Sequence, residues 1–279
     1  MIDQADTASN TPDGGHMIPF PDRFYFFPET WNCYPLLEWQ TTIQPGYAMP
    51  SGARGTLRID RTRFFLQDAI APFYLVWRNV PHELFETATD DAVLEFQLNN
   101  EDLSPLAEPK GFGENDIVLD LQPFAALGEN QLILRSAAST RPPLVIQDAL
   151  DLWGEFAVRT VDDLPVLVIP PLQIQPGPWA TQGYPAYQGV GVYRQKITLP
   201  DTAKGRPIFL GCESVLGEAE ICVNGTVVDI LRREPWRIEI TEALQDGENL
   251  FQFRVGPAFS HGTQPIIPSG LGPVYLEVF

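Results

Sequence analysis

Aromatic and amide side chains gather in one glycine- and proline-rich segment of the second half of the chain. The segment PGPWATQGYPAYQGVGVYRQ contains Trp179, Gln182, Tyr184 and Tyr187. Tyrosine and tryptophan rings have an apolar body and a polar tip, which suits a partly wet site, and an amide both donates and accepts hydrogen bonds. Such groups can stack on the C–H face of a sugar ring and bond its hydroxyls. We therefore treat these four residues as candidate carbohydrate contacts.

Two further residues join this set, and every candidate also has a structural interpretation. Trp236 follows the turn Arg-Arg-Glu-Pro, and His261 lies in the long loop 257–273; long loops in compact domains are often functional. Trp179 and Tyr184 could equally fill the seam between two domains. Trp236 is more typical of a hydrophobic plug at the end of a β-sandwich.

Sequence motifs for catalysis are weaker than this set of candidate sugar contacts. Glycoside hydrolysis needs two carboxylates about 5 to 9.5 Å apart on either side of the scissile bond. The pairs Asp90-Asp91 and Asp162-Asp163 fall in expected turns, and neighbouring strand residues point to opposite faces. The chain has no Gly-x-Ser-x-Gly elbow and no zinc-binding His-Glu-x-x-His among its three histidines. We expect no catalytic residue.

Net charge and composition limit the classes of molecule that this protein is expected to bind. The formal net charge is −18, from 36 acidic and 18 basic residues, which disfavours nucleic acid and anionic membranes. A neutral glycan is favoured over an acidic one. Cys33, Cys212 and Cys222 have no metal-ligand spacing, so buried free thiols are expected. No cofactor is expected, although a structural calcium ion stays an open alternative because carboxylates and carbonyls can hold one.

The elements that would position these side chains occur twice. Residues 55–135 and 191–254 follow the same order of strands, and Gly128-Glu129-Asn130 in the first copy matches Gly247-Glu248-Asn249 in the second. A repeat of this length indicates two copies of one domain. The copies differ at one turn, where the first has Asn99-Asn100 in place of the second copy's Asn-Gly. We therefore expect the ligand site in the second copy.

Strand-type patterns dominate the chain. Residues 94–98 and 117–121 alternate apolar and polar side chains, with 27 Pro and 22 Gly punctuating the sequence, as expected of short antiparallel strands. The prediction is an all-β protein of two tandem sandwiches. We expect a disordered leader or cloning remnant at 1–23 and a first β-sandwich module with an aromatic lead-in at 24–160. A Pro-rich connector at 161–172 and a second β-sandwich module at 173–279 should follow.

Three segments of the second copy support a resemblance to a known family. They read EAEICVNGTVVDI (218–230), WRIEITEALQDGENLFQFRV (236–255) and PSGLGPVYLEV (268–278). These resemble the galactose-binding-like jelly roll of β-galactosidase- and β-glucuronidase-like glycoside hydrolases. The tandem arrangement looks closer to the C-terminal sandwiches of α-L-rhamnosidase-like enzymes, in which a strand like LWGEFAV (152–158) ends the first sandwich.

The resemblance implies a non-catalytic carbohydrate-binding or accessory module of a larger glycoside hydrolase. Its partners would be a glycan and a catalytic domain, because a catalytic (β/α)₈ barrel needs roughly 250 residues of its own. A purely structural sandwich that buttresses such a barrel is the alternative, and a glycoside hydrolase in its own right is less favoured. The resemblance alone suggests an extracellular or periplasmic location, while the first residues show no signal-peptide pattern.

Overall fold

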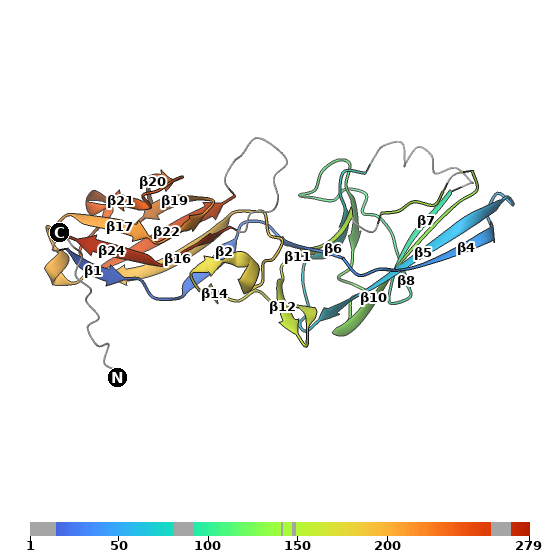
Figure 1. Ribbon diagram of the computed structural model, residues 1–279, viewed down its shortest axis with the longest axis horizontal. Coiled ribbons are helices and arrows are strands. Elements are labelled where there is room, and N and C mark those ends of the chain that lie inside the picture. The colour runs from blue at the N-terminus through green and yellow to red at the C-terminus, as the bar shows by residue number, and fades with distance from the viewer. Residues whose placement is uncertain (1–14, 81–91, 141, 147–148, 258–268) are drawn as a thin grey trace. The chain divides into compact units, whose positions relative to one another are not determined.

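The structure is a computed structural model, and it describes residues 15–80, 92–140, 142–146, 149–257 and 269–279. The all-β prediction is confirmed, since sheets of mainly antiparallel strands, with short 3₁₀ helices, make up the described elements. The chain divides into two compact units (Figure 1). Unit 1 joins the residues up to Thr30 with Pro171–Phe279, and unit 2 is Trp31–Pro170.

Unit 1 is built from two larger sheets and a small one. The first sheet contains, in spatial order, β1 (His16–Pro19), β24 (Val274–Val278), β17 (Ile208–Cys212) and β21 (Arg237–Glu239). The second contains β14 (Gln173–Ile174), β2 (Phe24–Pro28), β16 (Gly191–Thr198), β22 (Glu248–Gly256), β19 (Glu218–Val223) and β20 (Thr226–Leu231). The small sheet contains β15 (Gly177–Pro178), β23 (Gly270–Leu271) and β18 (Val215–Leu216). Apolar residues of the two larger sheets share one core, as in a β-sandwich.

Two N-terminal strands belong to this C-terminal unit. In β1, Ile18 pairs with Leu276, and in β2, Phe26 pairs with Tyr193 (Figure 1). The side chains of β2 alternate between buried and exposed, so the period-two pattern of a half-buried strand completes the second sheet. The expected parts placed 1–23 outside the folded modules and 24–160 in the first one. The structure differs because an aromatic strand is most stable where a core covers it.

Unit 2 has two sheets around a second core. The larger contains β12 (Ala157–Val161), β13 (Leu164–Val168), β5 (Arg54–Leu66), β10 (Gly128–Ala138), β7 (Ala92–Leu98) and β8 (Glu101–Leu103), and β4 (Gln40–Ala48) also pairs with β5. The smaller contains β3 (Asn32–Pro35), β11 (Leu150–Gly154), β6 (Phe73–Trp77) and β9 (Ile117–Asp120). Phe64 and Leu134 of the first sheet meet Phe73 and Leu152 of the second in the core.

The Pro-rich stretch at 161–172 is less of a connector than the sequence suggests. Leu164–Val168 forms strand β13, which pairs antiparallel with β12 and parallel with β5. Most of this stretch is therefore part of unit 2. No helix in the described part of the chain is long and apolar enough to cross a membrane.

Candidate functional site

Three of the predicted carbohydrate contacts lie in the core of unit 1. Trp179, Tyr184 and Tyr187 are 1%, 2% and 5% exposed. Trp179 lies 5.6 Å from the ring of Phe26, measured between centroids, and Tyr184 lies 5.2 Å from it. A sugar stacks on an uncovered ring face, and here other side chains cover the faces. The prediction that these three rings contact a glycan is therefore corrected: they pack the sandwich.

The close packing of these rings depends on a glycine next to them. A Cβ at Gly191 would lie 2.5 Å from the ring of Phe26 and 2.7 Å from that of Trp179. The Trp179 indole donates from Nε1 to the Tyr193 hydroxyl at 2.5 Å, and that hydroxyl also accepts from the main-chain N–H of Leu271 at 3.1 Å. The irregular segment is therefore held by its own aromatic residues.

The remaining predicted contacts have different surroundings. Gln182 is half-buried and closes a loop, because its amide accepts from the main-chain N–H of Gln175 at 2.7 Å and donates to the carbonyl of the same residue at 2.8 Å. Trp236 is half-buried and packs against the core of unit 1. His261 lies outside the described residues. The structure therefore brings three of the six together, in a core.

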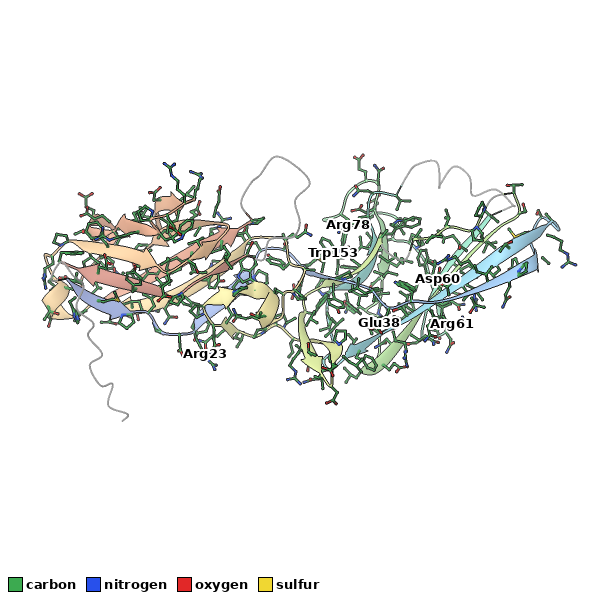
Figure 2. The ribbon with its side chains drawn as sticks, viewed as in Figure 1. Arg23, Glu38, Asp60, Arg61, Arg78 and Trp153 are labelled. Atoms are coloured by element: carbon green, nitrogen blue, oxygen red, sulfur yellow. The ribbon has the colours of Figure 1, made fainter. Side chains whose placement is uncertain are left out.

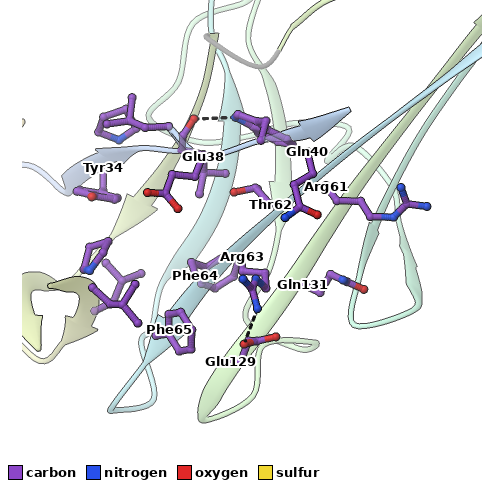
Figure 3. Close-up of a pocket in the computed structure, with 17 residues that line it drawn as sticks. Tyr34, Glu38, Gln40, Arg61, Thr62, Arg63, Phe64, Phe65, Glu129 and Gln131 are labelled. Atoms are coloured by element: carbon purple, nitrogen blue, oxygen red, sulfur yellow. Dashed lines mark hydrogen bonds and ion pairs between the residues drawn. The ribbon is translucent and has the colours of Figure 1, made fainter. Parts of the chain in front are cut away.

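A groove of about 1000 Å³ lies in unit 2 (Figure 3). Four segments form its walls: the chain between β3 and β4, the end of β5, the start of β10, and β13. Its aromatic side chains include Tyr34, Trp39 and Phe65, all half-buried. Its charged and amide side chains are two carboxylates, two guanidiniums and two amides: Glu38, Glu129, Arg61, Arg63, Gln40 and Gln131.

Strand alternation places the polar groups of the groove. Along β5, Phe64 is part of the core, so the neighbouring Arg63 and Phe65 belong to the opposite face. In the antiparallel register, Gln131 of β10 stands opposite Arg63, and Glu129 stands opposite Phe65. Cross-strand neighbours on one face are within side-chain reach of each other. One sheet face therefore offers a ring, a guanidinium, a carboxylate and an amide together.

The charges of the groove are partly paired. Arg63 Nη1 lies 3.3 Å from Glu129 Oε2, as Figure 3 shows by a dashed line. Arg61 donates from Nη1 to the Thr42 hydroxyl at 3.4 Å, and no ion pair of Arg61 occurs among the described residues. Glu38 and Arg61 lie in the same part of unit 2 (Figure 2). The groove thus combines a neutralised pair with further polar groups.

The aromatic residues of the segment before β4 are held in place by the fold. Trp39 donates from Nε1 to the carbonyl of Leu36 at 2.8 Å, and both Trp39 and Tyr34 pack against the core of unit 2. Burial raises the pKa of the Tyr34 hydroxyl, and the negative charge of Glu38 raises it further. The Tyr34 hydroxyl therefore keeps its proton to a higher pH than a free tyrosine does.

The sequence pattern did not point to this groove. RTRFF in β5 reads as an ordinary half-exposed strand, and the expectation placed a ligand site in the second copy. The groove arises where residues 34–40 and 164–167, far apart in the chain, meet the same strand. Among the residues with described positions, no group of three or more His, Cys, Asp or Glu side chains could hold a metal ion. The arrangement is suited to binding a polar molecule.

Comparisons with known proteins give partial structural matches. No protein-family model matches the chain, and no curated protein matches it. A β-glucuronidase from an uncultured Clostridium species matches at 20% identity over 43% of this chain and 24% of its own, with a TM-score of 0.33. A rhamnosidase from Novosphingobium sp. PP1Y matches at 18% identity over 86% of this chain and 25% of its own, with a TM-score of 0.33.

An α-L-rhamnosidase from Streptomyces avermitilis, solved with L-rhamnose, is a third such match. Its identity is 14% over 89% of this chain and 26% of its own, with a TM-score of 0.34. The chain thus spans about a quarter of the length of these glycoside hydrolases.

Proposed function

We propose that this chain is a non-catalytic carbohydrate-binding or accessory module of a larger glycoside hydrolase, and that the groove of unit 2 holds the glycan. In this proposal both units are galactose-binding-like jelly rolls, and the native protein works outside the cytoplasm. The sequence resemblance described above motivates these finer points. The observation that carries the proposal is the groove itself.

The groove has the chemical composition that sugar recognition requires. A pyranose presents apolar C–H faces and a rim of hydroxyl groups, so a ring such as Phe65 can stack on it while planar amides and charged groups bond its rim. The carboxamide of Gln131 and the carboxylate of Glu38 are exposed and line the same groove. Strands β5 and β10 and the core behind them keep the site largely pre-formed, which lowers the entropy lost on binding.

Charge favours a neutral glycan as the ligand. The net charge of −18 repels an anionic polymer at long range. Within the groove, the guanidinium of Arg63 already pairs with Glu129, so binding a uronate there would require breaking that pair. A neutral oligosaccharide needs no such exchange.

The proposal is tested by a glycan array followed by calorimetric titration of the glycans that bind. Phe65→Ala and Gln131→Ala should each weaken binding about tenfold, which corresponds to about 1.4 kcal/mol. Phe124→Ala is the matched control, since Phe124 is a comparably exposed phenylalanine of unit 2 outside the groove. It should leave the affinity unchanged. Absence of binding at millimolar glycan, or equal losses in all three variants, would refute the glycan site.

A structural role for unit 1 is the second candidate. It is favoured by the burial of Trp179, Tyr184 and Tyr187, since these aromatic residues hold a core together. In this proposal unit 1 buttresses a catalytic domain. Gln182, Trp236 and His261 stay proposed glycan contacts of unit 1 only under the first candidate. If a Trp236→Ala variant binds every array glycan as the unaltered protein does, unit 1 has a purely structural role. Release of nitrophenol from aryl glycosides by the purified chain would instead show an enzyme.

A further inference from the structure

The groove contains one main-chain segment that the sheet leaves open. The main-chain N–H of Gln67 donates to the carbonyl of Leu167 in β13 at 2.9 Å. Alternate residues of a strand point their N–H and C=O groups to the same edge. Phe65 and Arg63 therefore direct their main-chain groups to the edge of β5 where β13 lies.

The hydrogen bonds at the opposite edge of β5, where β10 lies, independently show which way the main-chain groups of Arg63 point. Gln131 of β10 bonds Asn99 through both its N–H and its C=O, each at 3.0 Å. Those groups therefore face away from β5, and the neighbouring residues of β10 face toward it. Their partners in register are Thr62 and Phe64. The main-chain groups of Arg63, between these two, point to the other edge.

That other edge changes partners at Arg63. Strand β4 pairs with β5 as far as Arg61, where Gln40 is its partner, and β13 begins to pair at Phe65, opposite Val166. Among the described strands, none pairs with Arg63 on this edge. The opening spans four residue steps, about 13 Å of strand, and all five residues from Arg61 to Phe65 line the groove.

A proline explains why β13 does not close the opening. In the parallel pair, the donor to the carbonyl of Phe65 is the N–H of Leu167. Two residues earlier on both strands, the donor to the carbonyl of Arg63 would be residue 165, which is proline. Proline has no N–H to donate. The sequence itself therefore ends the ladder at this position.

We propose that the main-chain N–H and C=O of Arg63 bind two neighbouring hydroxyl groups of the glycan in the groove. This inference rests on the proposed function and extends it to the ligand class, a saccharide with a free vicinal diol. The two main-chain groups lie side by side, one a donor and one an acceptor, and each hydroxyl can act as either. A main-chain polar group buried without a partner is costly, so a bound ligand would have to satisfy both groups.

A peptide strand is a poorer occupant of this opening. Strand addition needs a run of free main-chain groups along a sheet edge, whereas β4 and β13, among the described strands, leave the groups of a single residue without a strand partner. A compact molecule with hydroxyl groups on its rim meets the same donor and acceptor without a ladder. The geometry therefore favours a saccharide over a polypeptide.

The experiment compares Arg63→Ala with Arg63→Pro, using calorimetric titration of the tightest-binding array glycan. Both variants lose the guanidinium, but proline also loses the N–H. Proline is tolerated where the N–H faces away from the ladder, so both should retain the circular dichroism spectrum of the unaltered protein. The proline variant should bind about fivefold more weakly than the alanine variant, the loss expected from one hydrogen bond. Equal affinities would overturn the inference.

A second variant and a second measurement cover the case in which Arg63→Pro does not fold. Pro165→Ala restores an N–H opposite the carbonyl of Arg63 and should lower the affinity by a similar factor. Hydrogen exchange should show the Arg63 amide exchanging faster than those of Thr62 and Phe64, and slowing when glycan is bound. A protected Arg63 amide in the free protein, or unchanged affinity in Pro165→Ala, would refute the open main-chain site.

These results separate the two proposals. If the unaltered protein binds glycan and Phe65→Ala weakens it, the groove site stands whatever the Arg63 variants show. If Arg63→Pro then matches Arg63→Ala, the main-chain contact alone falls. If no glycan binds the unaltered protein, the proposed function fails, and the inference fails with it.

Discussion

Asn224 donates a hydrogen bond from Nδ2 to Oδ1 of Asn249 at 2.8 Å, and Asn99 donates the same bond to Asn130 at 2.8 Å. The donor asparagines adopt positive φ angles, 52° and 54° respectively. In both copies the acceptor is fully buried and also bonds the main chain of the residue four positions earlier. The two Gly-Glu-Asn segments of the sequence therefore form the same arrangement of hydrogen bonds, one in each unit.

This hydrogen-bond network should contribute equally to the free energy of unfolding of each unit. Asn249→Ala and Asn130→Ala each leave several buried main-chain and side-chain groups without partners, so each should lower the free energy of unfolding of its unit by about 3 kcal/mol. Urea unfolding followed by tryptophan fluorescence measures the change. Asn100→Gly is the control, because that residue is exposed and glycine tolerates its φ angle of 72°. A loss below 1 kcal/mol in either copy would contradict the equivalence.

Two buried tyrosines of unit 1 should respond oppositely to loss of the hydroxyl. The Tyr184 hydroxyl is buried and has no hydrogen-bond partner among the residues that the structure describes, so Tyr184→Phe removes an uncompensated polar group and should stabilise unit 1 by about 1 kcal/mol. The Tyr193 hydroxyl bonds Trp179 and Leu271, so Tyr193→Phe should destabilise it by about 2 kcal/mol. Thermal unfolding of both variants tests the contrast, and a shift of Tm in the same direction would refute it.

The N-terminal strands should be essential to unit 1. Phe20 is 8% exposed and contacts the ring of Phe251 at a centroid distance of 5.0 Å, so Phe20→Ala should cost about 3 to 5 kcal/mol. Tyr25→Ala, on the exposed face of β2, is the matched control and should cost little. Removal of residues 1–23 also removes β1, and should lower the Tm at least as much as Phe20→Ala. An unchanged Tm after this truncation would show that β1 contributes nothing.

Alkaline pH should weaken unit 1 through its buried acids. Burial raises the pKa of the Cys212 thiol from 9.0 to about 12, and burial also raises the pKa of the Tyr193 hydroxyl. Because the folded state holds these protons more tightly than the unfolded state, their stabilisation is complete below about pH 9 and is lost as pH rises towards 12. The slope for each group approaches about 1.4 kcal/mol per pH unit.

Urea midpoints between pH 6 and 11 measure this loss. Above pH 9, the urea midpoint of Cys212→Ala should fall less steeply with pH than that of the unaltered protein. Between pH 6 and 8, the difference between the two midpoints should stay constant. Parallel curves across the whole range would show that the thiol does not titrate differently in the two states.

Local sequence patterns predicted much of the fold and little of the site. Gly128 and Gly247 adopt positive φ angles in their turns, as the Gly-Glu-Asn repeat suggested. The sequence left Trp179 and Tyr184 open between glycan contact and the seam between two domains, because an irregular aromatic segment has no periodicity to show which face is covered. The structure places both rings in the core of unit 1. The groove could not be predicted, since it depends on which distant segments pair with β5.

The sequence by itself predicted the all-β class and the glycine turns, because these depend on side-chain periodicity and local backbone preference. Only the tertiary structure decided that the strand at Phe24–Pro28 completes unit 1. It also decided that Pro165 stands where a longer β5–β13 ladder would need an N–H donor to the carbonyl of Arg63. A period of two tells which side chains of a strand share a face, but it carries no information about the neighbouring strand. Pairing between distant strands is decided by the total area that the packed sheets remove from water.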